Sequence, residues 1–300
     1  MADEYTKMLA EGIKKLQATT TDDAIKREIV KQLIYKRADF ISAGVKVVGV
    51  QQFDNLDIKY AMPSEASVEY PVPEGAGASL SLIDWTEFTF SMQKAEGRFM
   101  ITDEARIRGV DNVQWQISIR RLGESLAYEK DKNILDTLIN GAGNTFSASA
   151  TWDTATASQI TADIAKGLNY VMSAKGVVDS DINRVALVLP MKAWTGLLRV
   201  VEIGNINRSI RDFIEDGYGI QILPSKYLTT DAIMLVKGAE TAIHAVLRPP
   251  AGIPLVEQKR HEGVGTEYIV RQFFNTKVIP ESSSQTSSTN RICVIEDVAS

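Results

Sequence analysis

The chain has 300 residues, of which 44% are hydrophobic and 24% charged, an ordinary globular composition. Its 33 basic and 38 acidic side chains give a net charge of −5, which argues against a general nucleic-acid binder with a basic domain or stripe. A single cysteine excludes an intrachain disulfide and a cysteine metal cluster. The acidic N-terminus has no apolar signal core, and no window approaches the ~20 apolar residues of a membrane helix. We therefore expect a soluble intracellular product without a membrane partner.

The N-terminal segment, residues 3–42, is predicted to form one or two amphipathic helices. Ile25, Ile29, Leu33 and Phe40 recur near helical spacing, with basic residues between them. The segment has a mixed surface and little reason to fold alone, so we interpret it as an arm. A short apolar strand follows at 45–53.

Residues 57–86 have the pattern of a long two-stranded excursion from the body. A polar extended stretch and VEYPVP (68–73) lead to a glycine-rich tip at 74–79. In the returning strand Phe88, Phe90 and Met92 alternate with polar residues. A two-stranded ribbon is marginal in water by itself, so it must rest on something, and a second subunit is the economical answer.

A long helix is predicted over 112–140, after a short helical turn that Thr102 or Asp103 caps. Asp111 with Gln114 resembles a capping box at its start, and Asn140-Gly141 ends it. Gly123 inside it indicates a bend or a close contact. Its charged side chains predict a solvated face, with pairing to neighbouring subunits as the alternative; they are Arg120, Arg121, Glu124, Glu129, Lys130, Asp131, Lys132 and Asp136.

After a Gly/Ser/Thr/Ala-rich linker at 141–158, the pattern becomes compact α+β. We expect a helix with Ile160, Ile164, Leu168 and Met172 on one face, and then helices near 190–202 and 206–215. Strands are predicted at 184–190, 218–224, 232–238, 241–249, 266–274, 276–280 and from 291 onward, after a Ser/Thr-rich hairpin loop.

No arrangement of residues suited to catalysis is apparent. His244 and His261 are far apart; we expect the first to be a strand residue and the second to be solvated in a turn. Cys293 is better read as a buried strand residue than as a nucleophile. The glycine clusters at 75–79 and 140–145 lack the lysine of a phosphate loop. The tryptophans are expected to be core or interface anchors: Trp85, Trp115, Trp152 and Trp194. We therefore expect no catalytic, cofactor-binding or metal-binding residue.

The order of these elements resembles the Hong-Kong-97-type major capsid protein fold, an α+β fold of tailed bacteriophages, archaeal tailed viruses and encapsulins. FTFSMQKAEGRFMITDEARIRG (88–109) is similar to the strand that leads to the family's spine helix. AYEKDKNILDTLINGAG (127–143) resembles the end of that helix, and TEYIVRQFFNTKVIPE (266–281) the closing strands. The resemblance covers nearly the whole chain, although element order carries more weight than any single motif.

The resemblance implies a division of the chain into the family's parts. These are an N-terminal arm (1–44), a P-domain strand (45–56), an E-loop (57–86), a P-domain with the spine helix (87–145), an A-domain (146–253) and P-domain return strands (254–300).

It also implies a structural protein and not an enzyme. Hexamers and pentamers of the chain would form an icosahedral shell around double-stranded viral DNA, assembled in the host cytoplasm and found in the virion. Each E-loop would lie over the adjacent subunit's spine helix, and any DNA contact would be non-specific. No lysine occupies 74–79, and Lys59 lies near the ribbon base, which argues against autocrosslinking. No coiled-coil preface precedes residue 45, so scaffolding, portal or decoration proteins would be separate.

Two alternatives stay open. The first is an encapsulin shell that encloses a cargo enzyme, which genomic neighbours would distinguish from a viral capsid. The second is an α+β metabolic enzyme, with an ATP-grasp-like or hydrolase site, which a stable monomer would favour.

Overall fold

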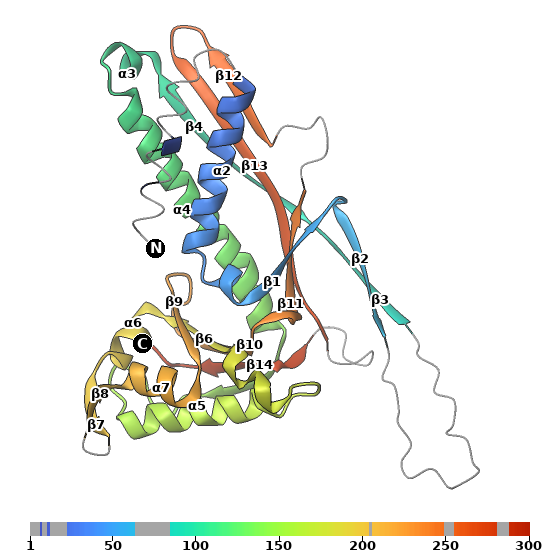
Figure 1. Ribbon diagram of the computed structural model, residues 1–300, viewed down its shortest axis with the longest axis vertical. Helices are drawn as coiled ribbons and strands as arrows, with labels where there is room; N and C mark the ends of the chain where they lie inside the picture. Colours follow the sequence, from blue (N-terminus) through green and yellow to red (C-terminus); the bar gives the residue numbers. More distant parts are fainter. Residues whose placement is uncertain are drawn as a thin grey trace.

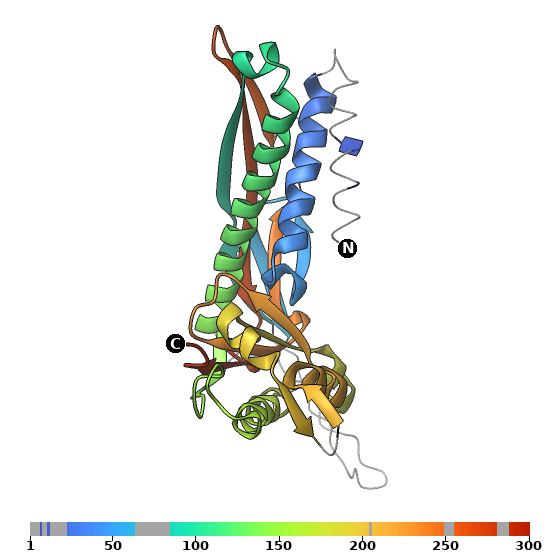
Figure 2. The ribbon, with the colours of Figure 1, turned by 90° about the vertical axis from the view of Figure 1, so that its left-hand side faces the viewer.

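The computed structural model describes residues 7, 11–12, 23–63, 85–203, 206–248, 255–280 and 288–300. The molecule has an elongated part, built of two long helices on a sheet, and a compact lobe at one end of it (Figures 1 and 2). Most of the predicted first helix, the VEYPVP strand, the glycine tip and most of the Ser/Thr-rich loop lie outside the described residues, and residues 7 and 11–12 of that helix are helical.

The two long helices are α2 (Asp23–Ile41) and α4 (Asp111–Asn140), which lie side by side (Figure 2). The 30 residues of α4 span about 45 Å at 1.5 Å per residue, which confirms the predicted long helix. Gly123 marks a close contact, because a Cβ there would lie 2.7 Å from Cγ of Arg37 in α2.

The elongated sheet has the order β1-β11-β13-β12, and β4 pairs with β13 on its other edge. Its strands are β1 (Val48–Phe53), β4 (Gln93–Thr102), β11 (Gly238–Leu247), β12 (Val256–His261) and β13 (Gly265–Val278). The sequence predicted a break near residue 275, but β13 is continuous, because Asn275 keeps its place in the ladder opposite Ala245. Trp115 packs with Phe99 and Tyr268 between this sheet and α4.

A two-stranded ribbon leaves the elongated part, as predicted. Its strands β2 (Asp57–Pro63) and β3 (Trp85–Ser91) are antiparallel and project away from the body (Figure 1). Phe88 and Phe90 are half-buried and alternate with exposed Glu87 and Thr89, which confirms the period-2 pattern. The side chain of Trp85 lies outside the described residues.

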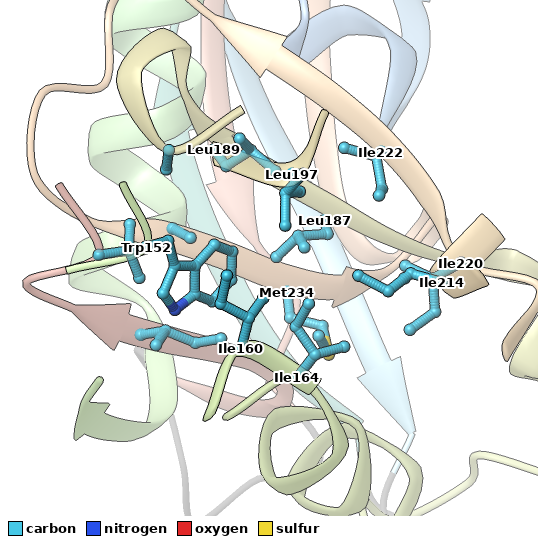
Figure 3. Packing of buried hydrophobic residues seen from close by; sticks show 14 of the residues in the cluster. Trp152, Ile160, Ile164, Leu187, Leu189, Leu197, Ile214, Ile220, Ile222 and Met234 are labelled. Atoms are coloured by element: carbon cyan, nitrogen blue, oxygen red, sulfur yellow. The ribbon is translucent and has the colours of Figure 1, made fainter. Parts of the chain in front are cut away.

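The compact lobe contains a sheet of order β5-β14-β10-β6-β9. Its strands are β5 (Ala142–Ser147), β6 (Val185–Pro190), β9 (Gln221–Ser225), β10 (Ala232–Val236) and β14 (Thr289–Glu296). The helices are α5 (Ala157–Met172), α6 (Met191–Leu197) and α7 (Ile210–Tyr218). Figure 3 shows Trp152, Ile160 and Leu187 in the shared core, so Trp152 is confirmed as a core anchor. Trp194 packs against the same core.

Two expectations for this lobe are wrong. The predicted linker at 141–158 contains β5, which pairs in parallel with β14. The hairpin β7 (Val200–Ile203) and β8 (Ile206–Ser209) replaces the expected helical residues between α6 and α7, as β-branched residues at 200, 201, 203 and 206 favour strands. In addition, β11 belongs to the elongated sheet and β14 to the sheet of the compact lobe.

Of the two predicted helix caps in this region, the cap of the short helix is confirmed and the capping box of α4 is wrong. Thr102 caps α3 (Asp103–Ile107) by accepting a bond from the Ala105 N–H. No capping box opens α4, because Val110 occupies the N-cap and the Gln114 side chain bonds to Thr102 instead. Within the described residues, every helix is too short or too polar to cross a membrane.

Candidate functional site

The residues screened for chemistry occupy structural positions. His244 is buried in β11 with Nδ1 2.9 Å from Thr276 Oγ1, and burial, with Lys130 nearby, lowers its pKa to about 3. His261 ends β12 and lies 2.9 Å from Glu267, so it is paired and not merely solvated. Burial raises the pKa of the Cys293 thiol to about 12, as expected for a strand residue. Among the described residues, no group of three or more His, Cys, Asp or Glu side chains could hold a metal.

Two charged residues of α4 are buried, which corrects the predicted solvated face. The Asp131 carboxylate accepts bonds from the backbone N–H of Gly44 at 2.8 Å and from the Ser42 hydroxyl at 2.5 Å. Burial raises the pKa of Asp131, and these bonds partly oppose the rise. Lys130 pairs with Asp39 of α2. Both residues therefore fasten the end of α2 to α4.

The remaining basic residues of α4 are available at its surface. Arg120, Arg121 and Lys132 are exposed and make no ion pair with the residues that the structure describes. Glu124, in contrast, pairs with Arg37 at 3.2 Å. The face that carries Arg121 and Lys132 is therefore a candidate surface for an acidic partner.

A groove of about 680 Å³ runs between α4 and β4. Its α4 side includes Glu129, Lys132 and Asp136, and its strand side includes Lys94 and Glu96. The groove has mixed charge and lies beside the exposed basic residues of α4, so it is wide and polar enough for an extended segment of another chain.

Apolar side chains are exposed at the far end of the elongated part. We call these residues the tip patch: Ile107, Val110, Val113, Ile117 and Val264. Ile107 is 86% exposed, and Val110, Val113 and Ile117 recur at helical spacing on one face. A bond from the Asp103 N–H to the Val264 carbonyl joins the β12–β13 turn to α3. Such a cluster of exposed apolar residues is typical of a protein–protein contact.

The base of the ribbon is held firmly. The side-chain amide of Asn275 donates to the Ser91 carbonyl at 2.7 Å, and the Ser91 hydroxyl donates to Asp57 at 2.5 Å. The first bond ties the ribbon to β13 and the second joins its two strands, and together with the groove and the tip patch the ribbon suits association between copies better than a reaction.

The family model for phage capsid proteins matches residues 86–281 of the 300. The chain belongs to the phage capsid protein family. It is therefore a structural component of the virion that associates with copies of itself, and not an enzyme. No curated protein sequence matches it.

Solved structures with the Hong-Kong-97-type fold resemble this phage capsid protein over most of its length. The virus-like particle from Pyrococcus furiosus has a TM-score of 0.61 at 12% identity and covers 92% of this chain and 100% of its own. The capsid of Myoviridae phage XM1 has a TM-score of 0.58 at 11% identity and covers 87% and 92%. The SrpI encapsulin of Synechococcus elongatus PCC 7942 has a TM-score of 0.53 at 11% identity and covers 87% and 90%. At these identities the likeness confirms the predicted fold class.

Two features of the structure are absent from the sequence predictions. The tip patch has a signal in the sequence, because apolar residues at 107, 110, 113 and 117 precede the main buried stripe of the helix. The burial of Lys130 has none, because its partner Asp39 lies 91 residues away in the chain.

Proposed function

We propose that this phage capsid protein forms hexamers and pentamers that close into an icosahedral shell around double-stranded DNA. In that shell the ribbon of one subunit lies in the α4–β4 groove of the next. Charge complementarity supports this contact. Residues 64–84 contain four acidic and no basic side chains, whereas α4 exposes Arg121 and Lys132 beside the groove.

The domain assignment is part of the proposal. An N-terminal arm would comprise residues 1–44, an E-loop 57–86, and a P-domain the elongated sheet with α4. Sheet membership supports placing β11 in the P-domain and β14 in the A-domain, which otherwise follows the compact lobe. Scaffolding, portal or decoration proteins would be separate chains.

Electron microscopy of the purified protein tests the assembly. Closed shells or capsomer rings are expected, and a stable monomer at every salt concentration would overturn the proposal. Particles recovered from infected cells should contain DNA; a protein cargo without DNA would favour the encapsulin alternative.

A charge exchange tests the ribbon contact. Replacing Arg121 and Lys132 with glutamate should prevent shell closure while helicity is retained, since glutamate is a good helix former. Adding Glu69→Lys and Glu74→Lys should restore closure. The glutamine variants at 121 and 132 serve as the matched control and should weaken assembly less. If Glu69→Lys and Glu74→Lys do not restore closure, this ribbon contact is contradicted, whereas the proposal that the protein forms a shell is unaffected.

A further inference from the structure

A second cavity, of about 250 Å³, lies between α2 and the β1–β11–β13 sheet. Val246, Leu247 and Leu255 give it apolar walls, and Asp39 and Lys130 lie at its α-helical side. His244 and Gln272 line it from the sheet, and Gln272 also lines the α4–β4 groove. The cavity is therefore partly apolar and partly polar, whereas the α4–β4 groove, which shares Gln272 with it, has a more charged lining.

Two buried acceptor atoms in this cavity lack partners. His244 is 0% exposed and Gln272 is 5% exposed. Within the described residues, neither Nε2 of His244 nor Oε1 of Gln272 has a hydrogen-bond partner. A buried polar atom without a partner costs on the order of 1–3 kcal/mol, so two such atoms on residues that line one cavity favour a bound molecule that donates hydrogen bonds to them.

The role of the His244 ring is fixed by a chain of hydrogen bonds that starts at the backbone. Asn275 donates from Nδ2 to the Ser91 carbonyl and accepts at Oδ1 from the Thr276 N–H, so its amide has one orientation. Asn133 donates to that same Oδ1 at 3.1 Å, which leaves Asn133 Oδ1 to accept from the Thr276 hydroxyl at 2.7 Å. Thr276 Oγ1 must then accept from Nδ1–H of His244 at 2.9 Å. Because a neutral imidazole carries one N–H, Nε2 presents a lone pair to the cavity.

The charges around the cavity favour a neutral ligand. Lys130 and Asp39 neutralise each other, and Lys31 pairs with Glu28 at 2.6 Å. A cation would meet the Lys130 ammonium, and an anion would meet two acceptor atoms. A hydroxyl group fits best, since it can donate to Nε2 or Oε1 and accept from an ammonium.

We propose that this cavity binds a small amphiphilic molecule with a hydroxyl group, such as a phenol or a short alcohol. The hydroxyl donates to His244 or Gln272, and the hydrocarbon part packs on Val246, Leu247 and Leu255. This site is independent of the proposed ribbon contact, so either can fail without the other.

Phenol and toluene are a matched pair of probes, because they differ by a hydroxyl in place of a methyl group. Calorimetry on the purified full chain should show phenol binding about tenfold tighter than toluene, the worth of one buried hydrogen bond. The double variant Gln272→Leu/His244→Phe should remove this preference, at least one of the two single variants should weaken it, and His261→Phe, at the other histidine, should retain it. If His244→Phe does not fold, Gln272→Leu provides the second measurement.

Nitrogen NMR of ¹⁵N-histidine protein gives a readout specific to the site, since the chain has two histidines. One ring should be protonated at Nδ1 alone, and phenol should shift its Nε2 resonance. Equal binding of toluene and phenol, an Nε2–H tautomer, or a density map with only water in the phenol-soaked cavity would each overturn the proposal.

Discussion

The ammonium of Lys130 in α4 lies 2.5 Å from the carboxylate of Asp39 in α2, and the two side chains are unequally buried, 2% and 50% exposed. The pair joins α2 to α4, the longest helix among the described residues. Because only one partner is withdrawn from water, the cost of breaking the pair depends on which partner is removed.

We expect Asp39→Asn to lower the free energy of unfolding by about 2 kcal/mol or more, because a buried ammonium loses its counter-charge. Lys130→Met should cost less than about 1 kcal/mol, since the Asp39 carboxylate stays hydrated and methionine fills similar space. Denaturant unfolding of unassembled subunits measures both. Equal losses would show that the asymmetry of burial has no energetic consequence.

Gly123→Ala should destabilise the contact between α2 and α4. Alanine raises helix propensity by about 1 kcal/mol, but its Cβ would lie 2.7 Å from Arg37 Cγ, and overpacking costs about 1–3 kcal/mol. Gly217→Ala in α7 is the matched control, since its Cβ would meet nothing closer than 4.0 Å, and it should stabilise the protein. The double variant Gly123→Ala with Arg37→Ala should recover part of the loss; if Gly123→Ala alone is stabilising, the contact is looser than described.

Much of the elongated part could be predicted from the sequence because its signals are local. The α4 periodicity and the alternation of Phe88, Phe90 and Met92 each lie within one segment. Strand β5 could not be predicted, because its Gly/Ser/Thr-rich sequence becomes a strand only by pairing with β14 near the C-terminus. The candidate sites show the same contrast between local and distant signals. The sequence predicts Arg121 and Lys132 as surface charges, whereas the burial of Lys130 depends on Asp39, a partner far away in the chain.

His244 should make the protein sensitive to acid. Its pKa is about 3 in the folded protein, whereas the unfolded chain has the ordinary value near 6.5, so between these values only the unfolded state binds the proton. The unfolding free energy should therefore fall by up to about 1.4 kcal/mol per pH unit as the pH drops from 6.5 toward 3. His244→Asn removes the pH dependence that His244 contributes to the unfolding free energy, while an amide N–H can still reach Thr276. As the pH falls, the unfolding free energy of the wild type should therefore decrease more than that of His244→Asn. If the two proteins show the same dependence of unfolding free energy on pH, His244 is not the residue that causes the sensitivity to acid.

The tip patch predicts an effect on assembly without an effect on folding. Ile107 is 86% exposed in the single subunit, so Ile107→Asp removes little buried surface, and its unfolding free energy should stay within about 0.5 kcal/mol of wild type. In a contact between copies the same carboxylate would be desolvated without a partner, which costs several kcal/mol. Sedimentation and electron microscopy should therefore show folded subunits or capsomers that do not close into shells. Val178→Asp, at an exposed valine of the compact lobe, is the matched control, and Ile107→Val should assemble normally. If Ile107→Asp forms shells as well as wild type, the tip patch lies outside the subunit contacts, and its exposure needs another explanation.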